Sequence, residues 1–372
     1  MKTVLFMFGG VSAEHEVSVV TGLQALEHLD RSKYDPAVMY ADKEGRLFHL
    51  PGLFSRKGYL RAKRIPASFG RDEKGGFVRA GGLTALRPYA AFLAFHGGTG
   101  ESGPLQGLLE SCGIPFTSCG VEASAVAMNK WLTKEAAKGI SVPVVPAVLV
   151  TGVEVRADSR AAAAKAEKEL GFPVIVKPAH LGSSIGISVA KSAVELEKRL
   201  IEAAHMDQTI VVERFLSGMT EYNCAVRKVA DTYEASEVER PLGKDEILSF
   251  ADKYERGAKK TGGGMASLQR ELPAKIPAEK RALIQEFAKK VFAAIGGKGM
   301  ARIDFMEHEG TLYLTEVNPI PGSMAFYLWE ASGIPYREQI STLIEEAVND
   351  AEAAKSLRLD YHSDIIERFV EG

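Results

Sequence analysis

Four polar side chains near the end of the chain have the types and spacing needed to hold a metal ion beside a phosphate. They are Arg302 and Asp304, which lie two residues apart, and Glu316 and Asn318, which also lie two residues apart. Alternate residues of a β-strand share a face, so each pair should point one way if its segment is a strand. Carboxylate and amide oxygens are hard ligands that suit Mg²⁺, and a guanidinium suits a phosphate or a developing oxyanion.

A β-hairpin is the element that would bring these two pairs together. Residues 299–306 and 311–317 are apolar, alternating runs, and the Glu-His-Glu-Gly segment between them ends in Gly310, which can supply the positive φ of a turn. We therefore expect antiparallel pairing, with a cation, two carboxylates and an amide on one face of the sheet. Taken alone, the same pattern would also fit the solvent-facing side of a hairpin that binds nothing.

A second hairpin is predicted where an apolar strand ends in a lysine. The strand covers residues 172–178 and includes Lys177, a tip rich in Gly and Ser follows at residues 182–186, and a second strand covers residues 187–190. Small residues let backbone N–H groups close on phosphate oxygens, and the lysine adds a point charge. The alternative is an ordinary flexible turn. A Walker loop is excluded, because it would need the G-x-x-x-x-G-K-[ST] pattern at the start of a helix.

Two further segments could serve a nucleotide. In the apolar strand over residues 209–216, Glu213 stands where the apolar run breaks, and Glu221 follows shortly after it. Backbone groups at such a crossing could hydrogen-bond an adenine edge, and a carboxylate could take ribose hydroxyls, although each glutamate alone would fit a surface position. The Lys- and Gly-rich stretch at residues 243–268 is long for a loop inside a compact domain, which favours a lid over phosphates.

Composition narrows the classes of function. With 372 residues the chain is long for one hydrophobic core, so two or three domains are expected. Lys and Arg total 46 against 48 Asp and Glu, a balance that argues against a nucleic-acid binder, and no basic helix or long apolar run suggests a membrane. The 3 cysteines lack C-x-x-C spacing, so neither a disulfide framework nor a zinc site is indicated and a cytoplasmic protein is expected.

The first third of the chain predicts a doubly wound parallel sheet. Strand patterns alternate with a helical pattern, at residues 4–8, 18–29, 34–40 and 90–95. Ligand loops belong at the carboxyl ends of such strands, where Gly-rich loops cover residues 9–16 and 96–103. The first loop lacks G-x-G-x-x-G, which disfavours a nicotinamide dehydrogenase. Residues 53–82 are polar and Gly-punctuated, and we expect an irregular insertion there.

Helices are predicted in the later part of the chain as well. One covers residues 123–138, ends at Gly139 and carries Lys130, although a single helical lysine is usually a solvated surface residue. Another covers residues 277–295 and leads into the hairpin that carries the four polar side chains.

Taken together, these motifs resemble the ATP-grasp superfamily and, within it, the D-alanine:D-alanine ligase family, over nearly the whole chain. The matching segments are GGVSAEHEVS at residues 9–18, HGGTGE at 96–101, GIPFT at 113–117, VKP with GSSIG at 176–186, and RID with EVN at 302–318. The resemblance implies an α/β protein with an α+β C-terminal part in a three-domain ATP-grasp architecture. Its implied domains are an N-terminal substrate domain (1–118), a central subdomain (119–214) and a C-terminal subdomain (215–372) with the lid (243–268) and the metal site.

The resemblance also implies an activity, which is the joining of two D-alanines into D-alanyl-D-alanine for peptidoglycan through an acyl phosphate. The implied cofactors are ATP and two Mg²⁺ (or Mn²⁺) ions, and the implied partners are small molecules, with a homodimer as the assembly. The implied nucleotide contacts are Lys130, Lys177, Gly182, Ser184 and Lys253 for the phosphates, and Glu213, Phe215 and Glu221 for adenine and ribose. The implied metal ligands are Asp304, Glu316 and Asn318. The implied catalytic groups are Glu14 for the first ammonium, Ser183 and Tyr254 linked to it, and Arg302 with the Gly322 N–H for the oxyanion.

One stretch departs from the family pattern. After Gly322 the family usually has a serine-containing segment that binds the carboxylate of the second D-alanine, whereas residues 323–329 here read SMAFYLW. Either Tyr327 donates a hydrogen bond in its place, or the pocket differs. Tyr254 favours an amine nucleophile over D-lactate, so D-alanine is the expected second substrate. The alternatives are D-serine or D-lactate as second substrate, and a non-catalytic homologue that only binds ATP.

Overall fold

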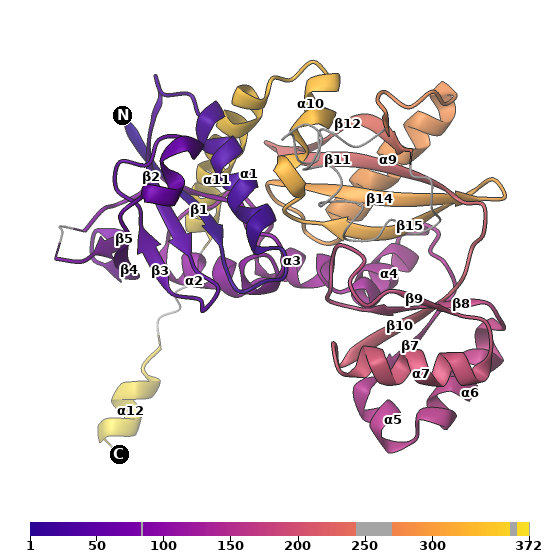
Figure 1. Cartoon of the computed structure of the whole chain (residues 1–372). Helices are drawn as coiled ribbons and strands as arrows, with labels where there is room; N and C mark the ends of the chain where they lie inside the picture. Colours follow the sequence, from indigo (N-terminus) through magenta and orange to yellow (C-terminus); the bar gives the residue numbers. More distant parts are fainter. Residues whose placement is uncertain (83–84, 243–269, 358–362, 372) are drawn as a thin grey trace.

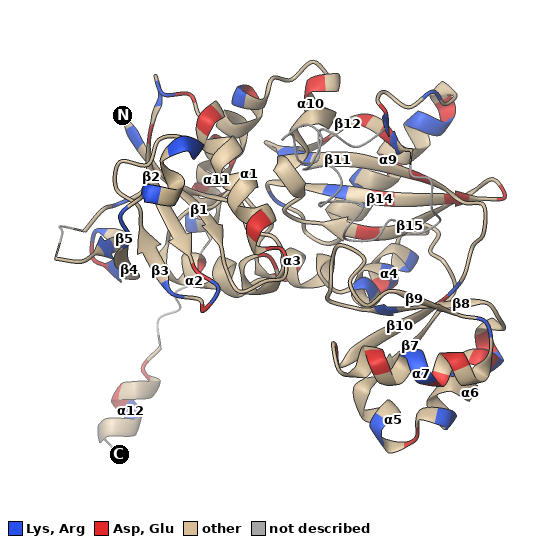
Figure 2. Ribbon diagram, viewed as in Figure 1, with Lys and Arg blue, Asp and Glu red and all other residues tan. Residues whose placement is uncertain are grey.

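Three β-sheets with helices packed against them make up the chain in a computed structural model that describes residues 1–82, 85–242, 270–357 and 363–371 (Figure 1). Lys and Arg are interspersed with Asp and Glu over the molecule in the view of Figure 2, as expected from the net charge of -2. Among the described helices, none has the length and apolar character that crossing a membrane requires.

The first sheet has six strands in the order β5-β4-β3-β2-β1-β6. Their bounds are Lys2–Gly9 (β1), Tyr34–Ala41 (β2), Leu47–His49 (β3), Ile65–Asp72 (β4), Gly75–Ala80 (β5) and Ala90–Leu93 (β6). β1 pairs with β2 and β6 in parallel, as predicted, and helices α1 (His15–His28) and α2 (Pro104–Cys112) alternate with these strands. The pairs β2–β3, β3–β4 and β4–β5 are antiparallel, so the sheet is mixed and not parallel throughout. The buried strand β1 therefore delivers its carboxyl end, with the loop that precedes α1, to one edge of the sheet.

The interpretation of residues 53–82 as an irregular insertion was wrong. A short 3₁₀ helix, Arg56–Arg61, is followed by the antiparallel hairpin β4–β5, which extends the first sheet through β3. The strands are largely half-buried or exposed, so a strong apolar alternation, the usual sign of a strand, is missing from their sequence.

The second sheet has the order β7-β10-β8-β9, with every pair antiparallel. Its strands are Ala147–Thr151 (β7), Val174–Pro178 (β8), Ser188–Ala190 (β9) and Thr209–Arg214 (β10). Helices α5 (Gly152–Ala157), α6 (Ser159–Leu170) and α7 (Ala193–Ala204) cover the face that points away from the third sheet (Figure 1). The apolar stripe of α7, with Leu196 and Leu200 fully buried, packs into this core. The predicted β8–β9 hairpin is confirmed.

The third sheet is antiparallel, in the order β13-β12-β11-β14-β15. Its strands are Thr220–Val229 (β11), Thr232–Pro241 (β12), Arg270–Glu271 (β13), Met300–His308 (β14) and Thr311–Asn318 (β15). Helix α9 (Ala278–Ala294) packs on this sheet through Ile284, Val291 and Phe292. The predicted helix at residues 277–295 and the predicted hairpin after it are therefore both present.

The prediction of one helix over residues 123–138 was wrong, because the chain forms two helices there. They are α3 (Val121–Ala127) and α4 (Lys130–Gly139), and Asn129 between them has an extended backbone. Its side-chain oxygen accepts hydrogen bonds from the N–H groups of Trp131 and Leu132 at 3.0 and 3.1 Å. Asn129 is thus an N-cap that starts a new helix, a role that the apolar pattern alone does not reveal.

The last helices of the chain return to the first sheet. They are α10 (Phe326–Ala331) and α11 (Tyr336–Lys355), and a separate short helix, α12 (Ile365–Glu371), ends the chain. Leu328, Trp329 and Ile340 belong to the same buried core as Phe6 and Phe92 of the parallel strands. The hydrophobic core of the first sheet is therefore completed by residues from the far end of the chain.

Candidate active site

A cavity of about 270 Å³ is bordered by the second sheet, the third sheet and the loops at the edge of the first sheet. Every predicted site residue that the structure describes lines this cavity: Glu14, Lys130, Lys177, Gly182, Ser183, Ser184, Glu213, Phe215, Glu221, Arg302, Asp304, Glu316, Asn318 and Gly322. The predicted lid at residues 243–268, with Lys253 and Tyr254, lies outside the described residues. Segments far apart in the sequence thus converge as the motifs predicted.

The β14–β15 hairpin pairs antiparallel, as predicted, and its register sets the four polar side chains opposite one another. Arg302 lies opposite Asn318, and Asp304 lies opposite Glu316. Gly310 supplies a positive φ of 78° at the turn. The same row continues across the sheet, because Asp304 also lies opposite a residue of β11 that itself pairs with β12. That row reads Glu239, Asn223, Asp304 and Glu316 over four strands, and only its last two members were predicted.

Arg302 and Asp304 form a two-pronged ion pair at the floor of the cavity. The Arg302 Nε and Nη2 atoms donate to the two Asp304 carboxylate oxygens at 2.7 and 2.6 Å, and Asn318 Nδ2 donates to Asp304 Oδ2 at 3.0 Å. Burial alone would lower the pKa of Arg302, but the Asp304 carboxylate raises it well above its usual range. The guanidinium is therefore a permanent positive charge with a fixed orientation.

Asp304, Glu316 and Asn318 form a donor set that fits Mg²⁺. Their oxygens border the same cavity from adjacent strands, and Mg²⁺ takes one or two carboxylates together with water and substrate phosphates. Over the residues that the structure describes, no group of three or more His, Cys, Asp or Glu side chains is placed to hold a metal ion, so a cation at this hairpin would draw its remaining ligands from Asn318, water and phosphate oxygens.

The tip of the β8–β9 hairpin approaches the loop before α1. Ser183 donates a hydrogen bond from Oγ to Glu14 Oε1, which links the loop between β1 and α1 to this tip. A Cβ atom on Gly182 would lie 2.9 Å from Glu14 Oε2, so a larger residue there would push the Glu14 carboxylate aside. Ser183 and Ser184 both have left-handed backbones, with φ of 51° and 60°. Such a backbone is uncommon for residues other than glycine and turns successive N–H groups toward one point.

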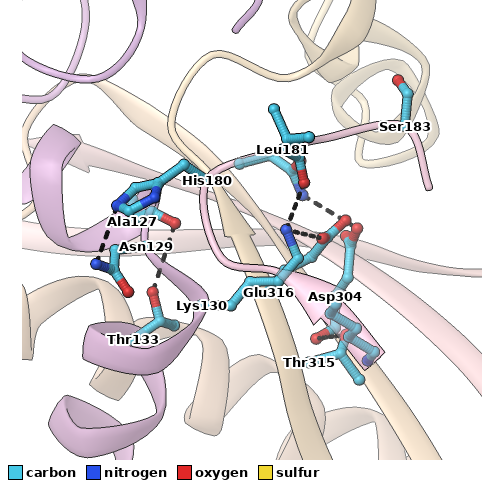
Figure 3. Close-up of polar contacts among 12 residues, drawn as sticks. Ala127, Asn129, Lys130, Thr133, His180, Leu181, Ser183, Asp304, Thr315 and Glu316 are labelled. Carbon is cyan, nitrogen blue, oxygen red and sulfur yellow. Dashed lines mark hydrogen bonds and ion pairs between the residues drawn. The ribbon is translucent and has the colours of Figure 1, made fainter. Parts of the chain in front are cut away.

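Lys130 connects this hairpin to the row of polar side chains that ends at Glu316. Its Nζ atom donates to the Leu181 carbonyl at 2.6 Å and lies 3.8 Å from Glu316 Oε2 (Figure 3). Lys130 is in the first turn of α4 and is only 8% exposed, which overrules the expectation of a solvated surface lysine. The break between α3 and α4 is what brings the ammonium group to the cavity.

Glu213 is buried between two lysines. Lys177 Nζ donates to Glu213 Oε2 at 2.8 Å, and Lys134 Nζ lies 3.0 Å from Glu213 Oε1. Burial favours the neutral acid, but the two ammonium charges prevail and lower the pKa of Glu213 to about 2. Burial in turn lowers the pKa of Lys134. Lys134 was missed in the sequence, where its signal is a position four residues after Lys130 on the same face of the helix.

His96 and Glu101 were also missed, although both lie in a segment that carried the resemblance. Glu101 accepts hydrogen bonds from the N–H groups of Gly97 at 2.6 Å and Ile320 at 3.0 Å, and so supports the segment that leads to Gly322. Burial is the main cause that raises the pKa of Glu101 to about 8, and the charges of nearby carboxylates raise it further against the two N–H donors. Burial likewise lowers the pKa of His96 to about 4.

Thr21 and His96 also hold the same segment through hydrogen bonds. The Ser323 N–H donates to Thr21 Oγ1 at 3.0 Å, and Thr21 Oγ1 lies 2.8 Å from His96 Nε2. Since His96 is neutral, its Nε2 can accept the Thr21 proton. The loops at the edge of the first sheet therefore fix the backbone on both sides of Gly322.

Tyr327, in the segment that departs from the family pattern, is buried beside Arg302. Its hydroxyl donates to Glu239 Oε2 at 3.2 Å, and the Arg270 guanidinium lies over its ring, 4.1 Å from the centroid. Arg270 Nη1 also lies 2.9 Å from Glu239 Oε1. The hydroxyl that was expected either to bond the second substrate or to lie in a different pocket is therefore bonded to a carboxylate of the protein.

Three sheets of this topology, with a cavity between two antiparallel ones, define an enzyme of the ATP-grasp class, so the predicted fold class is confirmed. A family model described as "D-ala D-ala ligase N-terminus" matches residues 3–119, and one described as "D-ala D-ala ligase C-terminus" matches residues 136–345. The chain belongs to the D-alanine:D-alanine ligase family.

Named relatives cover almost the whole chain. The D-alanine--D-alanine ligase of Thermosipho melanesiensis is 32% identical over 97% of each chain. That of Chlorobium chlorochromatii is 36% identical over 93% of this chain and 98% of its own. Among solved structures, the D-alanine-D-alanine ligase of Coxiella burnetii has a TM-score of 0.79 and 25% identity over 95% of this chain and 96% of its own. The VanG D-Ala:D-Ser ligase of Enterococcus faecalis has a TM-score of 0.78 and 25% identity over 93% of this chain and 99% of its own.

Proposed function

We propose that the protein joins two D-alanine molecules into D-alanyl-D-alanine at the expense of ATP, with the cavity as its active site. The observation that supports this most directly is the convergence, in one cavity, of an acidic loop residue, a small-residue hairpin tip and a row of oxygen ligands. A first amino acid, the phosphates of ATP and a divalent cation each have a chemically matched surface there.

The first D-alanine would bind through its ammonium group to Glu14. The carboxylate stands where the loop before α1 meets the hairpin tip, and the hydrogen bond from Ser183 holds its orientation. An ammonium donates up to three hydrogen bonds, and a fixed carboxylate is its natural acceptor. The first substrate's own carboxylate would then point toward the phosphate-binding groups.

The nucleotide would lie between the second and third sheets. Lys130 and Lys177 supply positive charge, and the N–H groups at Gly182 and Ser184 supply donors for phosphate oxygens. Since lysines already engage both oxygens of Glu213, we assign the ribose to Glu221 and the adenine edge to the backbone near Phe215. Asp304, Glu316 and Asn318 would hold two Mg²⁺ (or Mn²⁺) ions, which neutralise the charge of a phosphoryl group in transfer.

Arg302 and the Gly322 N–H would stabilise the oxyanion. A free carboxylate does not react with an amine because its leaving group is poor, so ATP first converts it into an acyl phosphate. The amine of the second amino acid then adds to that carbonyl, and the negative charge that develops on oxygen is met by the guanidinium and the N–H. Each preorganised donor of this kind typically contributes about 3 kcal/mol to the transition state.

D-serine is a second candidate for the second substrate. Glu239 lines the cavity, and its carboxylate is held by Asn223 at 3.1 Å and by Tyr327 at 3.2 Å. A carboxylate at that place could accept a hydrogen bond from a substrate hydroxyl, which D-alanine lacks. The names of the relatives at 32% and 36% identity favour D-alanine, and the name of the VanG structure keeps D-serine as the alternative.

The test is phosphate release from ATP with a panel of D- and L-amino acids and D-lactate, followed by mass identification of the product. We expect release with D-alanine and a product with the mass of a D-alanine dipeptide. A mixed dipeptide with D-serine as the main product would replace D-alanine as the second substrate. ATP hydrolysis or binding with no dipeptide from any amino acid would overturn the proposal.

A further inference from the structure

Asn129 and His180 make a contact that the proposed chemistry does not use. The Asn129 Nδ2 atom lies 3.1 Å from His180 Nε2, across the junction between α4 and the first arm of the β8–β9 hairpin (Figure 3). We propose that Asn129 and His180 are positioning residues, which hold the hairpin arm against the first turn of α4 so that Lys130 and the hairpin tip receive the nucleotide phosphates as one unit. This inference rests on the proposed function only in naming ATP as the ligand.

The contact is the middle one of three that join the start of α4 to the consecutive residues 179–181 of the arm. The Lys130 N–H donates to the Ala179 carbonyl at 3.1 Å, Asn129 meets His180, and Lys130 Nζ donates to the Leu181 carbonyl at 2.6 Å. Each residue of the arm that leads from β8 to the tip is therefore bound by one of two neighbouring residues of α4. The arm and the helix start cannot shift separately without breaking this set.

The protein determines which atom of Asn129 faces His180. Asn129 Oδ1 is the N-cap acceptor for the N–H groups of Trp131 and Leu132, so the amide nitrogen must be the atom that points to the imidazole. That nitrogen is a donor, and His180 Nε2 must accept from it. A flipped amide would lose the cap and would place an acceptor against an acceptor.

Asp207 fixes the other side of the imidazole. His180 Nδ1 lies 3.0 Å from both carboxylate oxygens of Asp207, and the His180 backbone N–H donates to Asp207 Oδ2 at 2.8 Å. Since Nε2 is the acceptor, Nδ1 carries the proton and donates it to Asp207. The chain of donors runs in one direction, from Asn129 through His180 to Asp207, and it ties the arm to the segment just before β10.

The hairpin tip needs such support because its own backbone is unfavourable. Ser183 and Ser184 adopt the left-handed region, which residues other than glycine occupy only where the surroundings hold them. An arm that is anchored immediately before the tip restricts the tip to that conformation. Preorganised N–H groups bind phosphate more tightly than mobile ones, because less conformational freedom is lost on binding.

A double-mutant cycle isolates this contact. Asn129→Ser keeps an N-cap oxygen, since Ser and Asn cap equally well, but it removes the donor to the imidazole. His180→Asn keeps a donor that can reach Asp207 but removes the acceptor at the Nε2 position. Each change should raise the dissociation constant of MgATP, measured by calorimetry without amino acid, by about fivefold to tenfold, the worth of one hydrogen bond. The double variant should bind within about twofold of the weaker single variant, because both changes break the same contact.

Two further variants serve as controls. Thr133 lies one turn further along α4, and its hydroxyl donates to the Val126 carbonyl of α3 at 2.8 Å, so Thr133→Val removes a hydrogen bond between the two helices without touching the arm. We expect it to leave MgATP affinity unchanged, although it lowers the melting temperature. His180→Gln, which puts an amide oxygen near the Nε2 position, should restore most of the affinity. In turnover assays Asn129→Ser should raise KM for ATP and leave kcat within about twofold.

The proposal is overturned if the single variants bind MgATP as the wild type does, if their effects multiply in the double variant, or if Thr133→Val weakens binding equally. A wild type that binds MgATP but forms no dipeptide would refute the proposed function, but the double-mutant cycle on MgATP binding could still be interpreted. A wild type that does not bind MgATP would refute both.

Discussion

Two hairpins border the cavity, and they hold their functional groups by different means. In β14–β15 the backbone register alone sets Arg302 and Asp304 opposite their partners. In the β8–β9 hairpin Lys177 belongs to a paired strand, but the other functional groups lie beyond the strands, at a tip that is held by Glu14, by Lys130 and by the Asn129 contact. The first arrangement is local to one hairpin, whereas the second depends on elements from three parts of the chain.

The difference predicts how each hairpin responds to substitution. A change on the β14–β15 face removes a functional group and leaves its neighbours in place, so its effect should appear in turnover. A change in the residues that hold the β8–β9 tip displaces groups that are themselves intact, so its effect should appear first in substrate affinity.

Glu316→Gln should have the largest effect. Loss of one ligand charge should lower the rate of ADP formation by more than about 100-fold, since even an outer-shell change at a metal site costs 10- to 100-fold. The matched control is Glu309→Gln at the turn of the same hairpin, where the side chain is 86% exposed. It should retain full activity. An active Glu316→Gln enzyme would mean that the metal lies elsewhere.

Ser183→Ala should act mainly on the first substrate. Without the hydroxyl that orients Glu14, we expect KM for the first D-alanine to rise by about 10-fold, the usual worth of a hydrogen bond to a charged group. Turnover at saturating D-alanine should change less. Measuring initial rates against D-alanine concentration separates the two parameters, and a fall in kcat with unchanged KM would place Ser183 with the chemical step instead.

A substitution of Glu101 tests how the backbone that follows β15 is held, because Glu101 accepts a hydrogen bond from the Ile320 N–H. Its pKa is raised to about 8, so in the folded protein it keeps a proton that the unfolded chain releases above about pH 4.5. Its contribution to stability is therefore fully present below about pH 4.5 and is lost as the pH rises toward 8. Between pH 5 and 8 the free energy of unfolding should fall by about 3 kcal/mol more in the wild type than in Glu101→Gln, which cannot titrate. Denaturant unfolding at several pH values measures this, and equal slopes would contradict it.

Tyr327→Phe should have the smallest effect. The variant keeps the ring under Arg270 but removes the donor to Glu239, so that carboxylate becomes more available to a ligand. We expect KM for the second D-amino acid to change by about threefold, and the affinity for D-serine should increase more than the affinity for D-alanine. Competition between the two amino acids, read by product mass, reveals the shift. Unchanged ratios would remove Glu239 from the second-substrate pocket.

The sequence predicted those features of the fold that follow from the periodicity of apolar and polar residues. Alternation along residues 299–317 was enough to put Arg302, Asp304, Glu316 and Asn318 on one face, because a strand has a fixed period of two. The parallel strands of the first sheet were predicted from the alternation of strand and helix patterns along the chain. Resemblance of motifs then identified residues such as Glu14 and Lys130, which no local pattern singles out.

What the sequence did not predict depends on contacts between distant segments. Lys134 is a functional neighbour only because Glu213 lies beside it, 79 positions away in the numbering. Glu101 takes its raised pKa from burial under a segment that begins more than two hundred residues later. The break at Asn129 depends on the side chain of this one residue, which caps α4. It is hard to see in the sequence because helix-forming residues lie on both sides.

The return of α11 to the first sheet bears on how the protein is made. Glu345 accepts hydrogen bonds from the hydroxyls of Tyr34 and Tyr89, both at 2.6 Å, and Trp329 and Ile340 fill the core beneath. While the ribosome is still translating the third sheet, the nascent parallel strands have an uncovered apolar side. A chain that stops before residue 328 would expose that side permanently, and we expect such truncated products to aggregate or be degraded rather than persist as folded N-terminal fragments.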